Sequence, residues 1–465
     1  MGKTKQPTNR SRTPLTKEFL EYISKNWAPK QDLGLERHPV ADFAAARRAK
    51  LAAQFPGKVL VIESGSMIPR SNDDEYRFRP LTAFAHLTGW GSETEPDSIL
   101  VIDARKKTSK SHLYLRPTAG HETEEFFANP AIGEFWVGSR PTLDDVASLL
   151  GIQTRDIKDF SKDSKKWEKP LSLKNAKLAE AVSVLRFVKD AYEINEMRKA
   201  VNATILGFAD VARALPTAAR KVRGERVVET AFYSRARLEG YDLGYSTIAA
   251  SGANACTLHW NRNDGEVKDG DLILVDAGVE MDSLYTADVT RTIPVNGKFT
   301  ELQKKVYDAV LEAADAAFAI AKPGVKFREI HNAAIEVIAK KTAELGLLPV
   351  SAEESLKPDN QFHRRFMVHG TSHHLGMDVH DCALARREMY QDGILEEGMV
   401  FTIEPGLYFH KDDLLVPEEL RGMGIRIEDD VLVVEGGVEN LSGALPRTTK
   451  GLEDWYQEQL LGSAG

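Results

Sequence analysis

The stretch Leu272-Ile-Leu-Val-Asp276-Ala-Gly278 is an apolar run that ends in one carboxylate, and Ala287-Asp288-Val-Thr-Arg-Thr292 opens a second run of strand-forming residues. Such runs predict β-strands. A hairpin that turns near Asp282-Ser283 would bring Asp276 and Asp288 close together across the strand pair. Two carboxylates at that range repel each other unless a cation neutralises them. The alternative is a surface hairpin whose acids face water.

Four histidines lie close together in Met367-Val-His369-Gly-Thr-Ser-His373-His374-Leu-Gly-Met-Asp-Val-His380. The glycines at 370 and 376 argue against a continuous helix, so this is not the HExxH helix of a zinc peptidase. A single histidine is commonly a core or surface residue. Four among small residues favour the lining of a functional site.

Two more acids follow or interrupt apolar strands. Glu404 ends Met399-Val-Phe-Thr-Ile-Glu404, and Glu428 follows Arg426 at a spacing of two, which places both on one face of a strand. Either acid alone could stand at an exposed strand end. Within β-branched strands, however, a carboxylate is costly unless it is paired or bound to a metal ion.

Together these segments supply four carboxylates and one imidazole, an oxygen-rich ligand set that suits Mn²⁺ or another hard divalent ion better than structural zinc. Two ions would share bridging carboxylates and one bridging water, which becomes a hydroxide nucleophile at neutral pH. The pattern therefore predicts metal-dependent hydrolysis. The same ligands would also accept cobalt or zinc.

The chain of 465 residues is too long for one hydrophobic core, so two domains are expected. Residues 1–37 are predicted to be a polar tail with a short helix, 38–178 a first domain of α/β type, and 179–465 a second domain of alternating helices and strands. The lysine-rich segment 158–177 is predicted to be the crossing between the domains. One helix, bent or straight, is predicted from near Ala179 through Arg198.

The predicted elements outside the candidate site follow apolar periodicity, capping residues and turn signals. Helices are predicted over 41–53, 301–322 and 327–345, and strands over 59–62, 98–102 and 112–115. The capping box Thr300-Glu-Leu-Gln303 begins the helix over 301–322.

The composition excludes several classes of function. The net charge of −8 argues against a nucleic-acid partner, and no apolar run is long enough to cross a membrane. The N-terminus has no secretory signal, and Cys256 and Cys382 are predicted to be free thiols in a reducing cytosol. A cytoplasmic enzyme is expected.

Asp276, Asp288, His373, Glu404 and Glu428 occur in the order and sequence contexts of the pita-bread metallopeptidases. This family contains methionine aminopeptidases, prolidases and Xaa-Pro aminopeptidases, with creatinase as a relative that uses no metal. The resemblance covers about 185–434. It implies a C-terminal pita-bread domain, and the first domain resembles the creatinase-like α/β domain that precedes it in prolidases and Xaa-Pro aminopeptidases.

The resemblance also implies roles for individual residues, with two divalent ions, Mn²⁺ by expectation, as cofactors. Asp276 would chelate one ion, Asp288 and Glu428 would bridge both ions, and His373 and Glu404 would complete the ligands of the second ion. Glu404 would also move the proton of the attacking water, and Arg426 matches an arginine beside the last ligand. His369 and His380 would hold the scissile carbonyl, and His259 would contact the substrate.

Within the family, the two-domain length argues against a methionine aminopeptidase, and the complete ligand set argues against creatinase. The stretches 84–90 and 421–430 resemble Xaa-Pro aminopeptidases, which release the first residue from peptides with proline second. The alternative is a prolidase, which cleaves Xaa-Pro dipeptides. A pita-bread binding module without catalysis is disfavoured because such modules have typically lost ligands.

Three further expectations come with the resemblance. A homodimer or homotetramer built through the first domain is expected. The interval between Asp276 and Asp288 is one residue longer than usual, which predicts a bulge or a wider turn. Arg186 is a candidate for a second family arginine, and His374 is expected in packing or at the surface.

Overall fold

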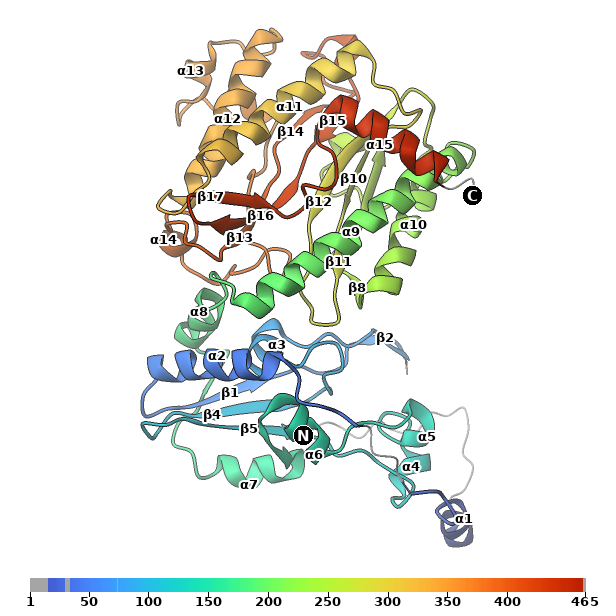
Figure 1. The fold of residues 1–465 in the computed structure, drawn as a ribbon, viewed down its shortest axis with the longest axis vertical. Helices are drawn as coiled ribbons and strands as arrows, with labels where there is room; N and C mark the ends of the chain where they lie inside the picture. Colours follow the sequence, from blue (N-terminus) through green and yellow to red (C-terminus); the bar gives the residue numbers. More distant parts are fainter. Residues whose placement is uncertain (1–15, 30–33, 73, 463–465) are drawn as a thin grey trace. The chain divides into compact units, whose positions relative to one another are not determined.

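The computed structural model describes residues 16–29, 34–72 and 74–462, and the chain divides into two compact units, Met1–Leu178 and Ala179–Gly465 (Figure 1). Much of the predicted tail, residues 1–15 and 30–33, lies outside the described residues. The short helix predicted behind the start of the tail is α1, Lys17–Ile23, whose first turn is capped by the Thr16 hydroxyl.

The first unit is built around a five-stranded mixed sheet in the order β6-β5-β4-β1-β7, with β1 and β4 antiparallel and β7 parallel to β1. Helices α2 and α3 lie on one face of the sheet and α7 on the other (Figure 1). The described elements of this unit after α1 are α2 (Val40–Gln54), β1 (Val59–Glu63), β2 (Pro69–Ser71), β3 (Asp74–Glu75), α3 (Thr82–Thr88), β4 (Ile99–Asp103), β5 (Lys110–Leu115), α4 (Glu125–Ala128), α5 (Glu134–Val137), α6 (Leu143–Leu150), β6 (Gln153–Asp156), α7 (Phe160–Ser164) and β7 (Leu171–Ser172).

The sequence predicted that the lysine-rich segment 158–177 is the connection between the domains. The structure shows that this segment also contributes a helix and a strand to the first unit. It supplies α7 and β7, and Phe160 packs edge-on against Tyr114 of β5 with ring centroids 5.4 Å apart. The segment lacks apolar periodicity because α7 and β7 are only five and two residues long.

The second unit has curved strands between two helix pairs (Figure 1). Helices α9 and α10 pack on β9, β10 and β12, and α11 and α12 pack on β13, β14, β15 and β16. The principal elements are α8 (Ala176–Val184), α9 (Ala191–Ala218), α10 (Gly224–Glu239), β8 (Asp242–Leu243), β9 (Ile248–Ser251), β10 (Leu272–Ala277), β11 (Val279–Glu280), β12 (Val289–Pro294), α11 (Glu301–Ile320), α12 (Phe327–Glu344), α13 (Ala352–Ser355), α14 (Arg387–Tyr390), β13 (Val400–Ile403), β14 (Gly406–Phe409), β15 (Met423–Arg426), β16 (Asp429–Val434), β17 (Gly437–Asn440) and α15 (Thr449–Leu461).

The single helix predicted from Ala179 through Arg198 is wrong, because α8 ends at Val184 and α9 starts anew at Ala191. A capping box causes the restart: the Asp190 carboxylate accepts hydrogen bonds from the backbone of Tyr192 and Glu193, and the Glu193 carboxylate accepts one from the backbone of Asp190.

The predicted hairpin is present, and it places the candidate ligands. In β10 and β12, Asp276 lies opposite Thr290, and the same register continues to the bridge between Glu280 and Thr286. The chain therefore has no bulge over this interval. It turns instead through a three-residue loop closed by Met281 N–H to Tyr285 O, and the last loop residue, Leu284, has a φ of 69°.

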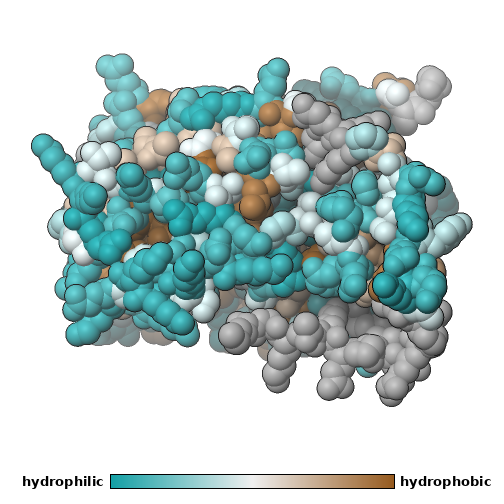
Figure 2. Space-filling view, turned by 90° about the horizontal axis from the view of Figure 1, so that it is seen from below, coloured by the Kyte–Doolittle hydropathy of each residue, from teal (hydrophilic) through white to brown (hydrophobic). Residues whose placement is uncertain are grey.

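Two predictions from the sequence, the absence of a membrane-spanning helix and the free cysteines, can be compared with the described residues. No helix among them is long and apolar enough to cross a membrane. The face shown in Figure 2 is mostly hydrophilic, with hydrophobic residues in small separate groups. Cys256 and Cys382 are both buried free thiols, as predicted.

Gly278 provides a test of the hairpin. A Cβ at this position would lie 1.8 Å from the carbonyl oxygen of Ala287 on the facing segment. We expect Gly278→Ala to lower the free energy of unfolding by about 1–3 kcal/mol or more, because the backbone must move to relieve the overlap. Denaturant unfolding measures the change.

Gly437→Ala in β17 is the matched control, since a Cβ there meets nothing within 4 Å. Equal stabilities of the two variants would contradict the close approach of the hairpin strands.

Candidate metal centre and active site

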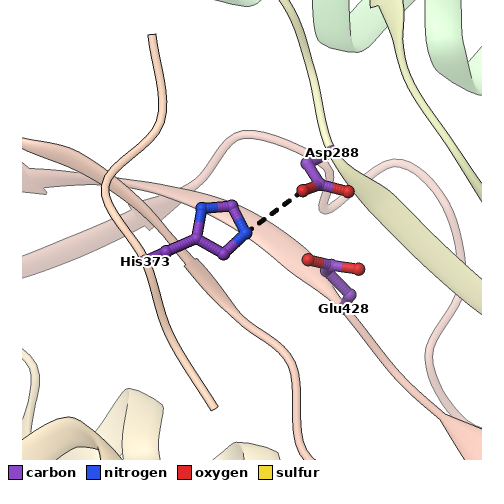
Figure 3. Close-up of side chains that lie close together, drawn as sticks. All are labelled: Asp288, His373 and Glu428. Carbon is purple, nitrogen blue, oxygen red and sulfur yellow. Dashed lines mark ion pairs between the residues drawn. The ribbon is translucent and has the colours of Figure 1, made fainter. Parts of the chain in front are cut away.

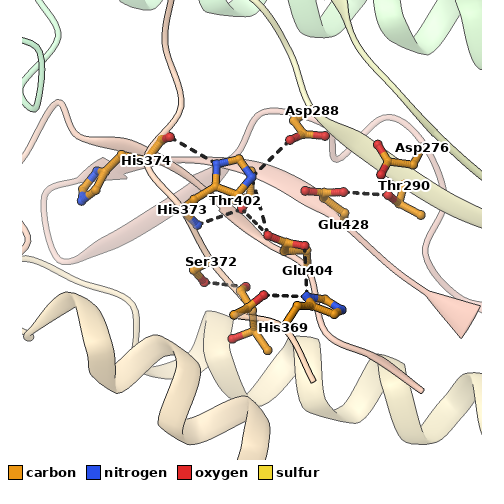
Figure 4. Close-up of polar contacts among 12 residues, drawn as sticks. Asp276, Asp288, Thr290, His369, Ser372, His373, His374, Thr402, Glu404 and Glu428 are labelled. Atoms are coloured by element: carbon orange, nitrogen blue, oxygen red, sulfur yellow. Dashed lines mark hydrogen bonds and ion pairs between the residues drawn. The ribbon is translucent and has the colours of Figure 1, made fainter. Parts of the chain in front are cut away.

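Strand ends deliver the candidate ligands to one place in the second unit (Figure 4). Asp276 lies near the end of β10, Asp288 immediately precedes β12, Glu404 follows β13, Glu428 joins β15 to β16, and His373 lies in the glycine-rich loop before β13. An isolated bridge between Thr290 and Glu428 fastens β12 to the β15–β16 segment, and the Thr290 hydroxyl donates to the Glu428 carboxylate at 2.6 Å.

Asp288, His373 and Glu428 form the tightest group (Figure 3). One ligand atom from each lies within 4.8 Å of the others. His373 Nε2 is 3.2 Å from Asp288 Oδ2 and 3.6 Å from Glu404 Oε1, so the imidazole faces two carboxylates. Its Nδ1 contacts the carbonyl of His374 at 3.2 Å. This contact orients the ring and leaves Nε2 for the site.

Asp276 is joined to this group through a shared hydroxyl. The Tyr245 hydroxyl lies 2.6 Å from an Asp276 carboxylate oxygen and 2.5 Å from one of Asp288. The other Asp276 oxygen accepts a hydrogen bond from the Arg426 guanidinium. Arg426 also donates to Thr290 Oγ1 at 3.1 Å. A network of buried polar groups therefore fixes both aspartates.

The negative charges of the carboxylates in the site exceed the positive charges of the side chains around them. Burial, reinforced by the neighbouring acids, raises the pKa of Glu428 well above its ordinary value. Burial also raises the pKa of Asp276, against the lowering influence of Arg426, and raises that of Glu404 to about 7 although His373 opposes the shift. Buried like charges of this kind are relieved by a cation, so the residues fit the binding of divalent metal ions.

The other predicted histidines line the same cavity, whose volume is about 490 Å³. His369 Nδ1 contacts the carbonyl of Gly370 at 2.7 Å, and its Nε2 lies 2.8 Å from the Tyr408 hydroxyl. Burial, followed by the charge of Arg426, lowers the pKa of His369 to about 3, so its imidazole is neutral. His380 and His259 also line the cavity, and the His380 ring meets the edge of His373 with centroids 4.5 Å apart.

Two other residues from the sequence analysis lie outside the cavity lining. His374 points away from the carboxylates (Figure 4) and stacks on Phe327 in the core, with ring centroids 4.3 Å apart. Arg186 is buried, donates to Asp381 at 2.7 Å and contacts Asp378 at 3.4 Å. Arg186 thus holds the loop that carries His380 and does not face the ligand group.

Sequence reasoning missed three groups that contact the candidate residues. Tyr245 joins Asp276 to Asp288, Tyr408 links His369 to Arg426, and the Asp430 carboxylate accepts a hydrogen bond from the Asp288 backbone at 3.0 Å. Tyr408 carried a signal, because it follows Glu404 on the next strand. Tyr245 lies in a loop, and nothing in its local sequence distinguishes it.

Comparison with known proteins identifies this arrangement. The family model for metallopeptidase family M24 matches residues 195–435, and that for the aminopeptidase P N-terminal domain matches residues 44–173. The chain belongs to metallopeptidase family M24. Its fold is mixed α/β, an aminopeptidase P-type N-terminal domain followed by a pita-bread domain, which confirms the fold and the family predicted from the sequence.

Curated Xaa-Pro aminopeptidases match this M24 chain over most of its length. It is 44% identical to Xaa-Pro aminopeptidase 1 of Streptomyces coelicolor, over 97% of this chain and 94% of the relative. It is 31% identical to the Xaa-Pro aminopeptidase of Escherichia coli, over 89% of this chain and 96% of that one. The structure of Pseudomonas aeruginosa aminopeptidase PepP superposes with a TM-score of 0.77 and 29% identity, covering 91% of this chain and 99% of that one. The chain is thus an enzyme of the Xaa-Pro aminopeptidase class.

The raised pKa values predict how the metal-free protein responds to pH. Glu404 has a folded pKa of about 7 against an ordinary 4.5, and His373 about 9 against 6.5, so these two groups bind more protons in the folded state than in the unfolded state across this range. Their contribution to the stability of the metal-free protein should therefore fall as pH rises from about 5 to about 8, because folding then requires uptake of those protons. Metal binding should remove most of this loss.

Thermal unfolding of chelator-treated and Mn²⁺-loaded protein checks this expectation, and the gap between their midpoints should widen with pH. The metal-free double variant Glu404→Gln/His373→Gln is the control and should show a shallower pH dependence. An equal pH dependence of the metal-free wild type and the metal-free double variant would contradict the assignment of these protons.

Proposed function

We propose that the chain hydrolyses the N-terminal Xaa-Pro bond of peptides and releases the first residue, with two divalent ions held by Asp276, Asp288, His373, Glu404 and Glu428. The observation that carries this proposal is the convergence of these side chains in one cavity that also holds His259, His369 and His380. The curated relatives that match the chain over nearly its whole length are Xaa-Pro aminopeptidases.

The two divalent ions would activate both the substrate and the attacking water. When bound, they supply Lewis acidity for the scissile carbonyl and a water acidic enough to serve, as hydroxide, as the nucleophile at neutral pH. Asp288, Glu428 and His373 would hold the ions together with Asp276 and Glu404, since one ligand atom from each of the first three lies within 4.8 Å of the others.

The protein's own side chains would then handle protons and orient the peptide. Glu404 lines the cavity beside His373, and its carboxylate would take a proton from water and return it to the leaving proline nitrogen. His380 has a lowered pKa and can donate the one N–H of its neutral ring to the peptide carbonyl. Neutral His369 carries its proton on Nδ1 and donates it to the Gly370 carbonyl, so its Nε2 accepts from the Tyr408 hydroxyl and the ring would hold the peptide by contact. Arg426, paired with Asp276 and contacting Tyr408, would hold these residues in place.

Finer parts of the assignment belong to the same proposal. Mn²⁺ is our candidate ion, although a solved structure of the Escherichia coli relative is described as zinc-substituted. Homodimeric or homotetrameric assembly and a cytoplasmic location are also proposed. A prolidase is the second candidate, and the names of the matched relatives favour the aminopeptidase.

The substrate test compares two peptides. Purified, Mn²⁺-loaded protein should release alanine from Ala-Pro-Ala, because an aminopeptidase leaves the downstream chain free to continue out of the cavity. Free alanine is measured by chromatography. Cleavage of Ala-Pro alone would assign a prolidase, and cleavage of neither peptide by metal-loaded protein would reject the proposed substrate.

Glu404 has a separate test. Glu404→Gln should lower kcat by about 10²–10⁴-fold, since it removes the group that transfers the proton while preserving size. Glu397→Gln, an exposed acid in the turn before β13, is the control and should retain full turnover. Near-normal kcat in the Glu404 variant, with metal content unchanged, would exclude the assigned role.

A further inference from the structure

A second, smaller cavity adjoins the metal site. Its volume is about 210 Å³, and its wall includes His331, Gln361, His363, Arg364, Met367 and Val368. It shares only His369 and Gly370 with the larger cavity. The proposed catalytic chemistry uses none of the six residues, so this cavity has no role in the mechanism described above.

Two side chains of this cavity, His331 and Arg364, can donate hydrogen bonds to a ligand. His331 Nδ1 accepts a hydrogen bond from the backbone N–H of Thr371 at 3.2 Å. Burial, with the nearby charges of His363 and Arg364, lowers the pKa of His331, so the ring is neutral and carries its proton on Nε2. No described residue accepts from that Nε2–H, which leaves it for a ligand.

Arg364 supplies the charge. It is exposed and, within the described part of the chain, makes no ion pair. Its neighbour Arg365 is different: both Arg365 Nε and Nη2 donate to the Asp413 carboxylate at 2.7 Å, and Arg365 does not line the cavity. One of two adjacent arginines is therefore neutralised, and the other faces the cavity with its charge available to an anion.

Gly370 leaves the way between the cavities open. A Cβ at this position would meet nothing closer than the Ser372 carbonyl oxygen at 3.9 Å, so the space beside its backbone is free. At the far end of the larger cavity Asp276, Arg426 and Glu428 are buried, whereas Gly370 and Val368 are exposed. A peptide whose amino end is held near Asp276 can thus continue past His369 over this exposed side.

We propose that the smaller cavity is the subsite for the residue that follows proline, and that Arg364 pairs with the C-terminal carboxylate of a tripeptide substrate. The inference rests on the proposed function and adds to it a preference for a free C-terminus among tripeptide substrates. The volume agrees: at about 30 Å³ per water, 210 Å³ holds roughly seven waters, the space of a residue or two. Each added residue advances an extended chain by about 3.5 Å, so the third residue of a tripeptide lies roughly 7 Å beyond the first.

The experiment compares Ala-Pro-Ala with its C-terminal amide in the Mn²⁺-loaded protein. Wild type should show a KM about twofold to fivefold lower for the free acid, the range expected of a partly exposed ion pair, with kcat similar for both. Arg364→Gln should raise the KM of the free acid to that of the amide and leave the amide unchanged. Arg365→Gln, which removes the same charge one residue away, should keep the wild-type preference.

Three outcomes would overturn the inference: equal KM values for acid and amide in wild type, a preference that survives in Arg364→Gln, or an equal loss in Arg365→Gln, which would indicate only the general field of the surface. Calorimetric binding of Pro-Ala and its amide to the metal-loaded protein gives a readout without turnover. If wild type cleaves neither tripeptide, the proposed function fails, and an Arg364-dependent preference for Pro-Ala, or its absence, then decides the subsite separately.

Discussion

Repulsion among buried carboxylates is the constraint on which the second unit depends. Asp276, Asp288, Glu404 and Glu428 come from separate segments, yet the fold brings them together around one cavity, where three of them are buried and Glu404 is half-buried. The hydroxyl of Tyr245, the guanidinium of Arg426 and the imidazole of His373 relieve only part of the charge, as the raised carboxyl pKa values show. Such an unfavourable cluster of buried charges indicates a functional site. Divalent ions would neutralise the remaining negative charge and would also supply the hydrolytic chemistry.

The surrounding architecture holds these groups rigidly. Helix pairs cover the outer faces of the strands, so each carboxylate ligand stands at or next to the end of a strand whose other residues pack in a core. Behind the ligands, Arg291 and Asp429 form a fully buried ion pair at 2.7 Å that joins β12 to β16. Removal of either partner would leave an unpaired buried charge, so this pair fixes the relative position of two ligand-bearing strands.

The sequence predicted the family, the α/β fold and the hairpin because an acid at the end of an apolar strand is a local and costly feature that needs a reason. It did not predict the contacts of Tyr245, which join loop to strand across 31 and 43 positions. It also missed the break before α9, because the apolar pattern runs through it and only the pairing of Asp190 with Glu193 marks a new start. Such features depend on which segments meet in three dimensions, and periodicity along one chain does not report that.

Anomalous X-ray scattering from crystals of the Mn²⁺-loaded protein tests the central claim most directly. The account predicts two metal peaks in each chain, both between the carboxylates and His373, with Asp288 and Glu428 in contact with each. A single peak, or metal bound only elsewhere on the molecule, would contradict the view that this cluster is a two-metal hydrolytic centre.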